Sequence, residues 1–174
     1  MNTTTLTTSF PTLRLTDVKA WMFATIFVVG NLILPQLAHV IQNGGFIFLP
    51  IYFFTLVGAY LYGWQVGLLT AVASPLLNSA LFGMPAPAVL PIIMIKGALL
   101  AIAASFAAHR YRKVSILILV AVVLAYQVVG CAIETAITGS WMVGLQDFRL
   151  GIPGMLMQVI GGYFSIKMLK KHLG

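Results

Sequence analysis

Two ionisable side chains, Lys96 and Glu134, stand inside long apolar stretches of the sequence. An ionised side chain near the centre of a bilayer costs about 2.5–3.5 kcal/mol on insertion scales, so such groups usually face a protein interior or a wet cavity. A buried ammonium can hold a carboxylate, a phosphate or a ring carbonyl, whereas a buried carboxylate can hold an amine or a ring N–H. The two residues could also pair with each other, and the sequence leaves both interpretations open.

Several uncharged polar side chains fall at a similar depth in neighbouring apolar stretches. Gln127 precedes Glu134 by two helical turns, so both side chains share one helix face and could line a cavity. An interhelical hydrogen bond is the competing interpretation for Gln127. Because these depths converge, we expect one ligand pocket that opens to the outside of the membrane. Its predicted contacts are His39, Asn43, Asn78, Lys96, Gln127, Glu134, Trp141 and Gln158.

Three of these predicted contacts lie in loops or at their edges. Trp141 could stack on a flat ligand, or it could anchor its loop at the membrane interface. His39 and Asn43 flank another loop, where His39 could contact a ligand or simply be solvated.

The sequence contains no recognised catalytic or cofactor motif. It lacks a Gly-x-Ser-x-Gly elbow, a His-Glu-x-x-His pair, a paired-Asp motif and a phosphate-binding Gly-rich loop. Its three histidines are far apart, and its single cysteine, Cys131, excludes a disulfide framework and any Cys–Cys metal or redox motif. We therefore expect no enzyme activity, no metal and no cofactor. Active transport would need energy from a partner or an ion gradient.

Composition indicates that membrane helices position these residues. Apolar residues make up 60% of the 174 residues and charged residues only 7%, against about 45–50% and about 25% in soluble domains. This excludes a soluble enzyme and a disordered chain, because so few charges cannot cover a water-exposed surface. The net charge of +7 does not indicate a nucleic-acid partner, since the basic residues flank apolar blocks.

Six apolar segments approach the length of about 20 residues that a spanning helix needs. They cover residues 18–40, 47–62, 65–82, 88–108, 114–138 and 151–169. The boundary between the second and third is open, because residues 46–82 are nearly continuous and could form one bent element. We predict an all-α integral membrane protein with six transmembrane helices. Residues 17–174 would form one compact bundle, and residues 1–16 a cytoplasmic N-terminal tail.

The distribution of Lys and Arg predicts the orientation of this bundle. With six spans, one side of the membrane would hold Arg14, Lys19, Arg110, Arg112, Lys113, Lys167, Lys170 and Lys171. The opposite side would hold only Arg149, in the same loop as Asp147. Because cytoplasmic loops carry the excess of Lys and Arg, we expect both termini in the cytoplasm.

The order of glycines and prolines resembles that of the substrate-binding (S) component of energy-coupling factor (ECF) vitamin transporters. The most specific stretch runs through Pro50, Gly58, Gly63, Gly67, Ser74-Pro75, Leu81-Phe82-Gly83-Met84-Pro85, Pro91 and Lys96-Gly97. The resemblance covers residues 17–170. The pair Ala20-x-x-x-Ala24 is also similar to the motif with which the first helix of this family docks on the transmembrane coupling (T) subunit, although internal packing is the alternative.

The resemblance implies a task and partners. An S component captures a vitamin or related micronutrient from outside, in a pocket formed by its helices four to six. It works with a T subunit and two ATPases in the bacterial or archaeal cytoplasmic membrane, and it is thought to topple in the lipid bilayer to release its ligand. Lys96 and Glu134 together suit a small polar heterocycle, but the resemblance does not identify the substrate.

Two other classes of protein fit the sequence. One is a structural membrane subunit of a cell-shape or wall-synthesis complex, in which Lys96 and Glu134 would pair and bind no ligand. The other is a small ion-coupled permease, in which both residues would relay ions.

Overall fold

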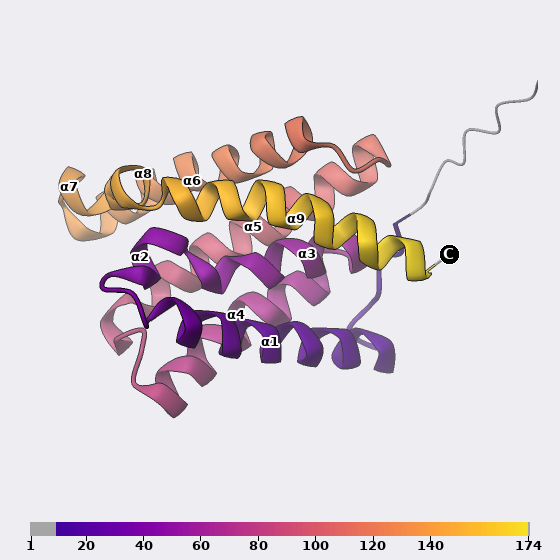
Figure 1. The fold of residues 1–174 in the computed structure, drawn as a ribbon, viewed down its shortest axis with the longest axis horizontal. Helices are drawn as coiled ribbons and strands as arrows, with labels where there is room; N and C mark the ends of the chain where they lie inside the picture. Colours follow the sequence, from indigo (N-terminus) through magenta and orange to yellow (C-terminus); the bar gives the residue numbers. More distant parts are fainter. Residues whose placement is uncertain (1–9, 174) are drawn as a thin grey trace, which may run out of the picture.

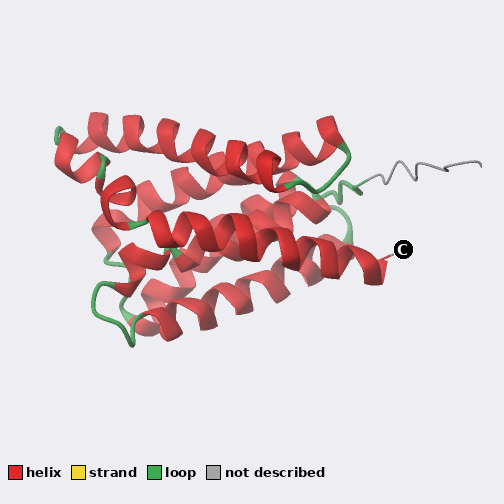
Figure 2. Cartoon of the chain, turned by 45° about the horizontal axis from the view of Figure 1, so that its top comes forward, coloured by secondary structure: helices red, strands yellow, loops and turns green. Residues whose placement is uncertain are grey.

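Every regular element in the described part of the chain is a helix. The computed structural model describes residues 10–173, and Figure 2 shows their helices joined by short loops. The all-α prediction is therefore confirmed for these residues. Most of the predicted N-terminal tail, residues 1–9, lies outside the described part of the chain, as does residue 174.

Five long helices make up most of the fold. They are α1 (Val18–Ala38), α4 (Trp64–Phe82), α5 (Leu90–Tyr111), α6 (Ile116–Thr138) and α9 (Ile152–Leu173). The shorter elements are α2 (Gly44–Phe48), η1 (Pro50–Tyr52), α3 (Phe53–Tyr62), η2 (Pro87–Val89), α7 (Trp141–Gly144) and α8 (Gln146–Leu150).

Within residues 10–173, four helices are long and apolar enough to cross a membrane. They are α1, α4, the stretch Pro87–Tyr111 that contains η2 and α5, and α6. Their lengths of 19 to 25 residues match the thickness of a bilayer core, which needs about 20 residues. This length and apolarity are those of a membrane-embedded protein. The corresponding predicted segments differ from the observed helices by only a few residues at each end.

The second predicted segment, residues 47–62, is not one continuous helix. It divides into α2, η1 and α3, because Leu49 adopts a left-handed φ of 46° and Pro50 follows it. Helix α3 ends at Gly63, whose φ of 97° is a conformation that glycine tolerates best. The chain therefore turns between α3 and α4, and residues 46–82 do not form one bent element.

Helix α3 lies at the centre of the bundle. Nine of its ten residues are buried, and it contacts α1, α4, α5 and α9. A helix that is apolar on all sides is typical of such a position. Small residues allow the close approach of its neighbours, since a Cβ at Gly67 would lie 2.5 Å from the Cβ of Ala59 and 2.8 Å from that of Ala101. Large apolar side chains such as Phe106 point outward, where lipid would meet them.

Ala20 and Ala24 lie on the inner face of α1, and their docking on a T subunit stays a prediction. Only 0% and 4% of their surfaces are exposed, and both belong to the apolar core. A partner subunit cannot touch either side chain in this conformation. In this conformation the two alanines serve the internal packing that the sequence offered as the alternative, because a small side chain lets α1 approach its neighbours closely.

The bundle has two distinct ends. Figure 1 shows the short helices α2, α7 and α8 gathered at one end, which we call the α8 end, and the C terminus at the other. At the far end the backbone N–H of Leu13 donates to the carbonyl oxygen of Tyr62, and the hydroxyl of Tyr60 donates to that of Lys113. These bonds tie the segment before α1 and the loop after α5 to the central helix.

Candidate functional site

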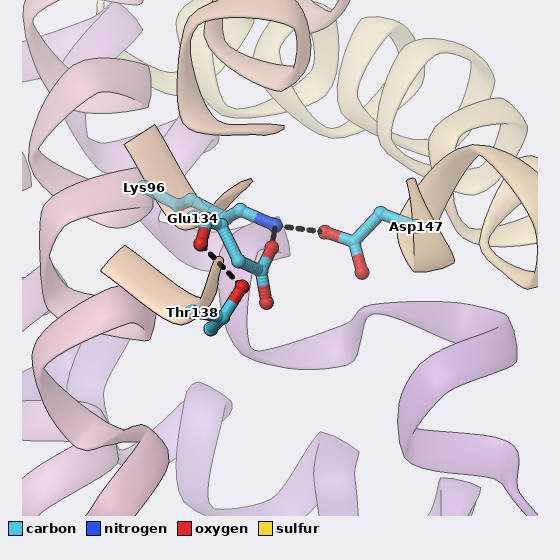
Figure 3. A network of polar contacts seen from close by, with 4 residues as sticks. All are labelled: Lys96, Glu134, Thr138 and Asp147. Atoms are coloured by element: carbon cyan, nitrogen blue, oxygen red, sulfur yellow. Dashed lines mark hydrogen bonds and ion pairs between the residues drawn. The ribbon is translucent and has the colours of Figure 1, made fainter. Parts of the chain in front are cut away.

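A buried charged cluster lies at the α8 end and consists of Lys96, Glu134 and Asp147 (Figure 3). The ammonium Nζ of Lys96 on α5 donates to Oε2 of Glu134 on α6 and, at 2.9 Å, to Oδ2 of Asp147 on α8. The Lys96 side chain is only 3% exposed, and those of Glu134 and Asp147 are 14% and 12% exposed. Two carboxylates thus share one ammonium, so the ionised cluster carries one excess negative charge.

Glycines on α6 and beside α8 make room for this cluster. A Cβ at Gly130 would lie 2.7 Å from Cγ of Lys96, so the lysine stem runs across the helix surface that Gly130 leaves bare. A Cβ at Gly144 would lie 1.9 Å from Oγ1 of Thr135, so this glycine lets α7 rest directly on α6. The sequence thereby holds the short α7–α8 segment where Asp147 reaches Lys96.

Two buried amide side chains, Gln127 on α6 and Gln158 on α9, form what we call the amide pair. Both are 0% exposed. The hydroxyl of Tyr126 donates to Oε1 of Gln158 at 2.9 Å. By contrast, Nε2 of Gln158 and both polar atoms of Gln127 are buried without any hydrogen-bond partner. A buried amide atom without a partner costs about 1–3 kcal/mol, so this arrangement calls for an explanation.

The amide pair adjoins the charged cluster. Gln127 shares a face of α6 with Gly130 and Glu134, and Gly130 supports the Lys96 stem. The rings of Tyr52 and Tyr126 are 5.6 Å apart between centroids, which places two phenol groups in the same region. The charged cluster is therefore followed along α6 by Gln127 and Tyr126, and Tyr126 bonds to Gln158 on α9 and lies near Tyr52.

Asn78, which we predicted in the same pocket, belongs to a second polar cluster between α1, α3 and α4. This core cluster consists of Asn31, Gln36, Thr55, Ser74 and Asn78. Asn78 donates through Nδ2 to the carbonyl oxygens of Asn31, at 2.9 Å, and of Ser74, at 3.0 Å. Its Oδ1 accepts a bond of 3.3 Å from Nε2 of Gln36. The side-chain hydrogen-bonding atoms of Asn78 are thus used within the bundle, away from Lys96.

Asn31 is the centre of the core cluster. Its Nδ2 donates to Oγ1 of Thr55 at 3.3 Å and to Oγ of Ser74 at 3.2 Å. Its Oδ1 accepts the backbone N–H of Phe54 at 3.2 Å. These bonds join three helices, and Asn31 is 0% exposed. The core cluster is therefore a hydrogen-bonded network between helices in which the side-chain polar atoms of Asn31 and Asn78 are paired.

The three predicted loop residues are exposed and do not bond directly to the charged cluster. Trp141 on α7 is 72% exposed, and His39 and Asn43 are exposed near α2. Among the residues that the structure describes, none of the three forms a side-chain hydrogen bond to Lys96, Glu134 or Asp147. Asn43 instead precedes α2 in a left-handed conformation with φ of 59°. Of the predicted pocket residues, the structure brings Lys96 and Glu134 into direct contact. Ligand contacts of His39, Asn43 and Trp141 stay predictions.

Sequence reasoning missed Asp147 and Asn31. Asp147 looked like part of a solvated outer loop, although it is one of only three acidic residues in a chain with a buried lysine. Because a buried cation needs anionic partners and few acidic residues are available, Asp147 could have been predicted as a partner of Lys96. Asn31 follows Ala24 by two helical turns, so it shares the inner face of α1. Its position on that face could have marked it as buried.

Two surface hollows lie away from these residues. The larger, of about 550 Å³, is lined by Thr12, Trp64, Ile102, Ser105, Phe106 and His109. The smaller, of about 260 Å³, is lined by Leu99, Ile102, Ala103, Phe106, Ala125, Tyr126 and Val129. Only Tyr126 is shared with the region of the amide pair. In the charged cluster the ammonium is buried and held by carboxylates, and the two carboxylates are partly exposed.

Comparison with known proteins gives no relative for this chain. No protein family, curated protein or solved structure matches it. Its function must therefore be inferred from the residues and their arrangement. What the arrangement can do chemically is hold a small polar ligand. The ammonium and the two carboxylates can exchange their internal bonds for bonds to such a ligand, and the unpaired amide atoms can form new bonds to it.

Proposed function

We propose that this chain is the substrate-capturing S component of an ECF-type importer for a vitamin or related micronutrient. It would work with a T subunit and two ATPases in a bacterial or archaeal cytoplasmic membrane. The resemblance of the Gly and Pro pattern over residues 46–97 supports this proposal. So does the position of the polar residues on α5, α6 and α9, which correspond to helices four to six of the predicted six.

The observation that carries the proposal is the unpaired amide pair beside the charged cluster. Polar side chains inside a membrane protein usually pair with one another, because lipid offers no hydrogen bonds. Outside this region, Oε1 of Gln65 on α4 is also buried without a partner among the described residues. In the amide pair, the atoms of Gln127 and Nε2 of Gln158 are buried without partners. A captured ligand would supply those partners, and the binding free energy would include the recovered cost of the unpaired amides.

The proposal includes six membrane crossings with both termini in the cytoplasm. The two crossings beyond the four long apolar helices would be η1 with α3, and α9. The far end of the bundle holds the predicted cytoplasmic groups: Lys170 on α9 lies 4.3 Å from the ring centre of Phe10, and Thr12 is hydrogen-bonded to His109. The charged cluster would then lie toward the outer surface, where a nutrient arrives.

A second candidate, a small ion-coupled permease, is favoured by one specific observation. Lys96 is already held by two carboxylates in the bundle interior, and such intramembrane groups are typical of ion and proton relays. In that case a proton or a metal ion, rather than an organic nutrient, would exchange at Glu134 and Asp147.

Mass spectrometry of the purified full chain tests the proposal. We expect a stoichiometric organic micronutrient to co-purify with the wild-type chain in detergent. The double variant Gln127→Leu/Gln158→Leu should lose it while staying folded, because leucine replaces each amide without changing net charge. Co-expression with T and ATPase subunits should recover a stable complex. Repeated preparations without any organic ligand, together with failure to bind a coupling module, would contradict the proposal. Recovery of wall-synthesis proteins instead would favour the structural class.

A further inference from the structure

The charge of the buried cluster restricts the class of ligand that it can accept. Lys96 contributes one positive charge, whereas Glu134 and Asp147 contribute one negative charge each. No other ion pair joins the residues that the structure describes. Arg149, the basic residue on α8, is exposed, and His39 at the same end is exposed as well. The excess negative charge in the bundle interior therefore has no cationic partner within the described chain.

The hydrogen-bonding atoms of the cluster are only partly used. Lys96 donates to Oε2 of Glu134 and to Oδ2 of Asp147. Within residues 10–173, no bond reaches Oε1 of Glu134 or Oδ1 of Asp147. Each carboxylate thus keeps one oxygen for a further donor. A carboxylate or phosphate ligand would bring more negative charge to these two oxygens, whereas a cation would bring both a donor and the balancing charge.

The amide pair is an independent sign that an organic ligand is accommodated here. Gln127 is 0% exposed and has neither a donor nor an acceptor partner. It lies on the α6 face that also carries Gly130 and Glu134. A bare inorganic cation can bind its carbonyl oxygen but cannot accept a hydrogen bond from its NH2 group. A ligand that pairs both atoms of Gln127 must carry a donor and an acceptor of its own.

We propose that the site takes a small organic monocation, a primary amine or a cationic nitrogen heterocycle with an uncharged polar edge. Its positive charge balances the second carboxylate of the cluster, and its polar edge pairs with the amide of Gln127. Tyr52 and Tyr126, whose ring centres are 5.6 Å apart, supply aromatic surface for the ring of such a ligand. This inference rests on the proposed function, because it names the ligand class of the same site.

Asp147 supplies the excess negative charge that makes the site prefer a cation. With Lys96 and Glu134 alone the cluster would be neutral and would favour no charge. Asp147→Asn keeps the size of the side chain and removes the excess negative charge. Arg149→Gln is the matched control, because it changes one charge on the same five-residue helix at an exposed position. If Asp147→Asn does not fold, Glu134→Gln removes the same charge from α6.

Calorimetry and thermal-shift measurements on the full chain in nanodiscs at neutral pH test the inference. The probes are two series of ring compounds, each with a cation, a neutral compound and an anion. The pyridine series is pyridylmethylamine, nicotinamide and nicotinate. The benzene series is benzylamine, benzyl alcohol and benzoate. Sodium chloride serves as an inorganic probe. We expect stabilisation by an amine and none by the matching carboxylate. Asp147→Asn should weaken amine binding by about ten-fold or more, the loss of one hydrogen bond to a charged group. Arg149→Gln should leave amine binding unchanged.

Each other outcome overturns a defined part of the account. Tighter binding of nicotinate or benzoate than of the amines overturns the ligand class but leaves substrate capture standing. Failure of both amines to bind overturns the class as well. Stabilisation by sodium alone, lost in Asp147→Asn, overturns the ligand class and favours the ion-coupled permease. Association with T and ATPase subunits is measured separately on the same preparations, so failure of the proposed function is recognised independently.

Discussion

The two buried polar regions of this bundle differ in whether their polar atoms have hydrogen-bond partners. In the core cluster between α1, α3 and α4, the side-chain polar atoms of Asn31 and Asn78 are paired at distances of 2.9 to 3.3 Å. At the α8 end, the charged cluster carries an excess charge and the amide pair leaves three atoms without partners. A network of paired polar groups holds helices in fixed positions relative to one another. Unpaired polar groups remain able to form hydrogen bonds to a ligand.

The helices that carry the two clusters differ in the same sense. The core cluster joins three helices along the bundle. The charged cluster depends on α8, a helix of five residues that holds Asp147. Short elements with glycine neighbours open more readily than long packed helices. The comparison thus separates a rigid scaffold from a region that can rearrange around a ligand, and substitutions in each region should behave differently.

The largest loss of stability is expected for Lys96→Met. This change leaves Glu134 and Asp147 buried without their cation, and breaking a buried ion pair costs about 3–5 kcal/mol. Denaturant unfolding in detergent measures the change in the free energy of unfolding. The exposed Lys167 provides the control Lys167→Met, which should change it by less than about 1 kcal/mol. Equal effects of the two variants would show that the charged cluster is not the ionised assembly described here.

A smaller loss is expected for Asn31→Leu in the core cluster. The substitution removes the partners of Thr55, Ser74 and the Phe54 amide, which should lower the free energy of unfolding by about 1–3 kcal/mol. A double-mutant cycle with Ser74→Ala measures the coupling between the two residues. Because they belong to one network, the two losses should not add. Additive losses would mean that the core cluster does not act as a unit.

A local effect is expected for Gly144→Ala. The added Cβ would meet Oγ1 of Thr135 at 1.9 Å and the carbonyl oxygen of Cys131 at 2.9 Å. Overpacking of this kind costs about 1–3 kcal/mol, and the short α7 should shift to keep the cost near the lower value. Alkylation of the buried Cys131 is the readout and should become faster. Adding Thr135→Ala to this variant should partly restore the protection of Cys131. An unchanged alkylation rate in Gly144→Ala would contradict the close packing of α7 against α6.

The apolar pattern was sufficient to predict most helices and their ends. A long apolar run with few charges crosses a bilayer as a helix. The positions of these runs in the sequence therefore predicted α1, α4, α5 and α6 within a few residues. The segment at residues 47–62 was predicted less well. Its left-handed turn at Leu49 depends on tertiary contacts, since neither leucine nor the residues around it favour positive φ.

The composition of the site was harder to predict, because sequence gives the depth of a residue but not its direction. Asn78 and Lys96 fall at similar depth, yet Asn78 bonds to α1 and Lys96 to α6 and α8. Rotation of one helix against another is set by packing of many small contacts. The same lack of directional information left both docking and internal packing open for Ala20 and Ala24. It also left Asp147 in a loop, because no local pattern shows that a loop folds back into the bundle.

The smallest effect on stability should come from Gln127→Leu, and it tests the contrast between the two clusters most directly. Both amide atoms of Gln127 are unpaired, so leucine removes their desolvation cost without breaking a bond. The empty protein should be unchanged or more stable by about 1 kcal/mol, whereas Asn78→Leu should destabilise it.

The decisive measurement compares ligand retention and unfolding midpoint for these two variants in the same detergent. If the α8 end binds the ligand, Gln127→Leu loses the co-purified molecule and keeps or raises the midpoint of the empty chain. Asn78→Leu should lower the midpoint and still carry the molecule. Loss of stability in Gln127→Leu with full ligand retention would contradict the account, because Gln127 would then be a structural residue like Asn78.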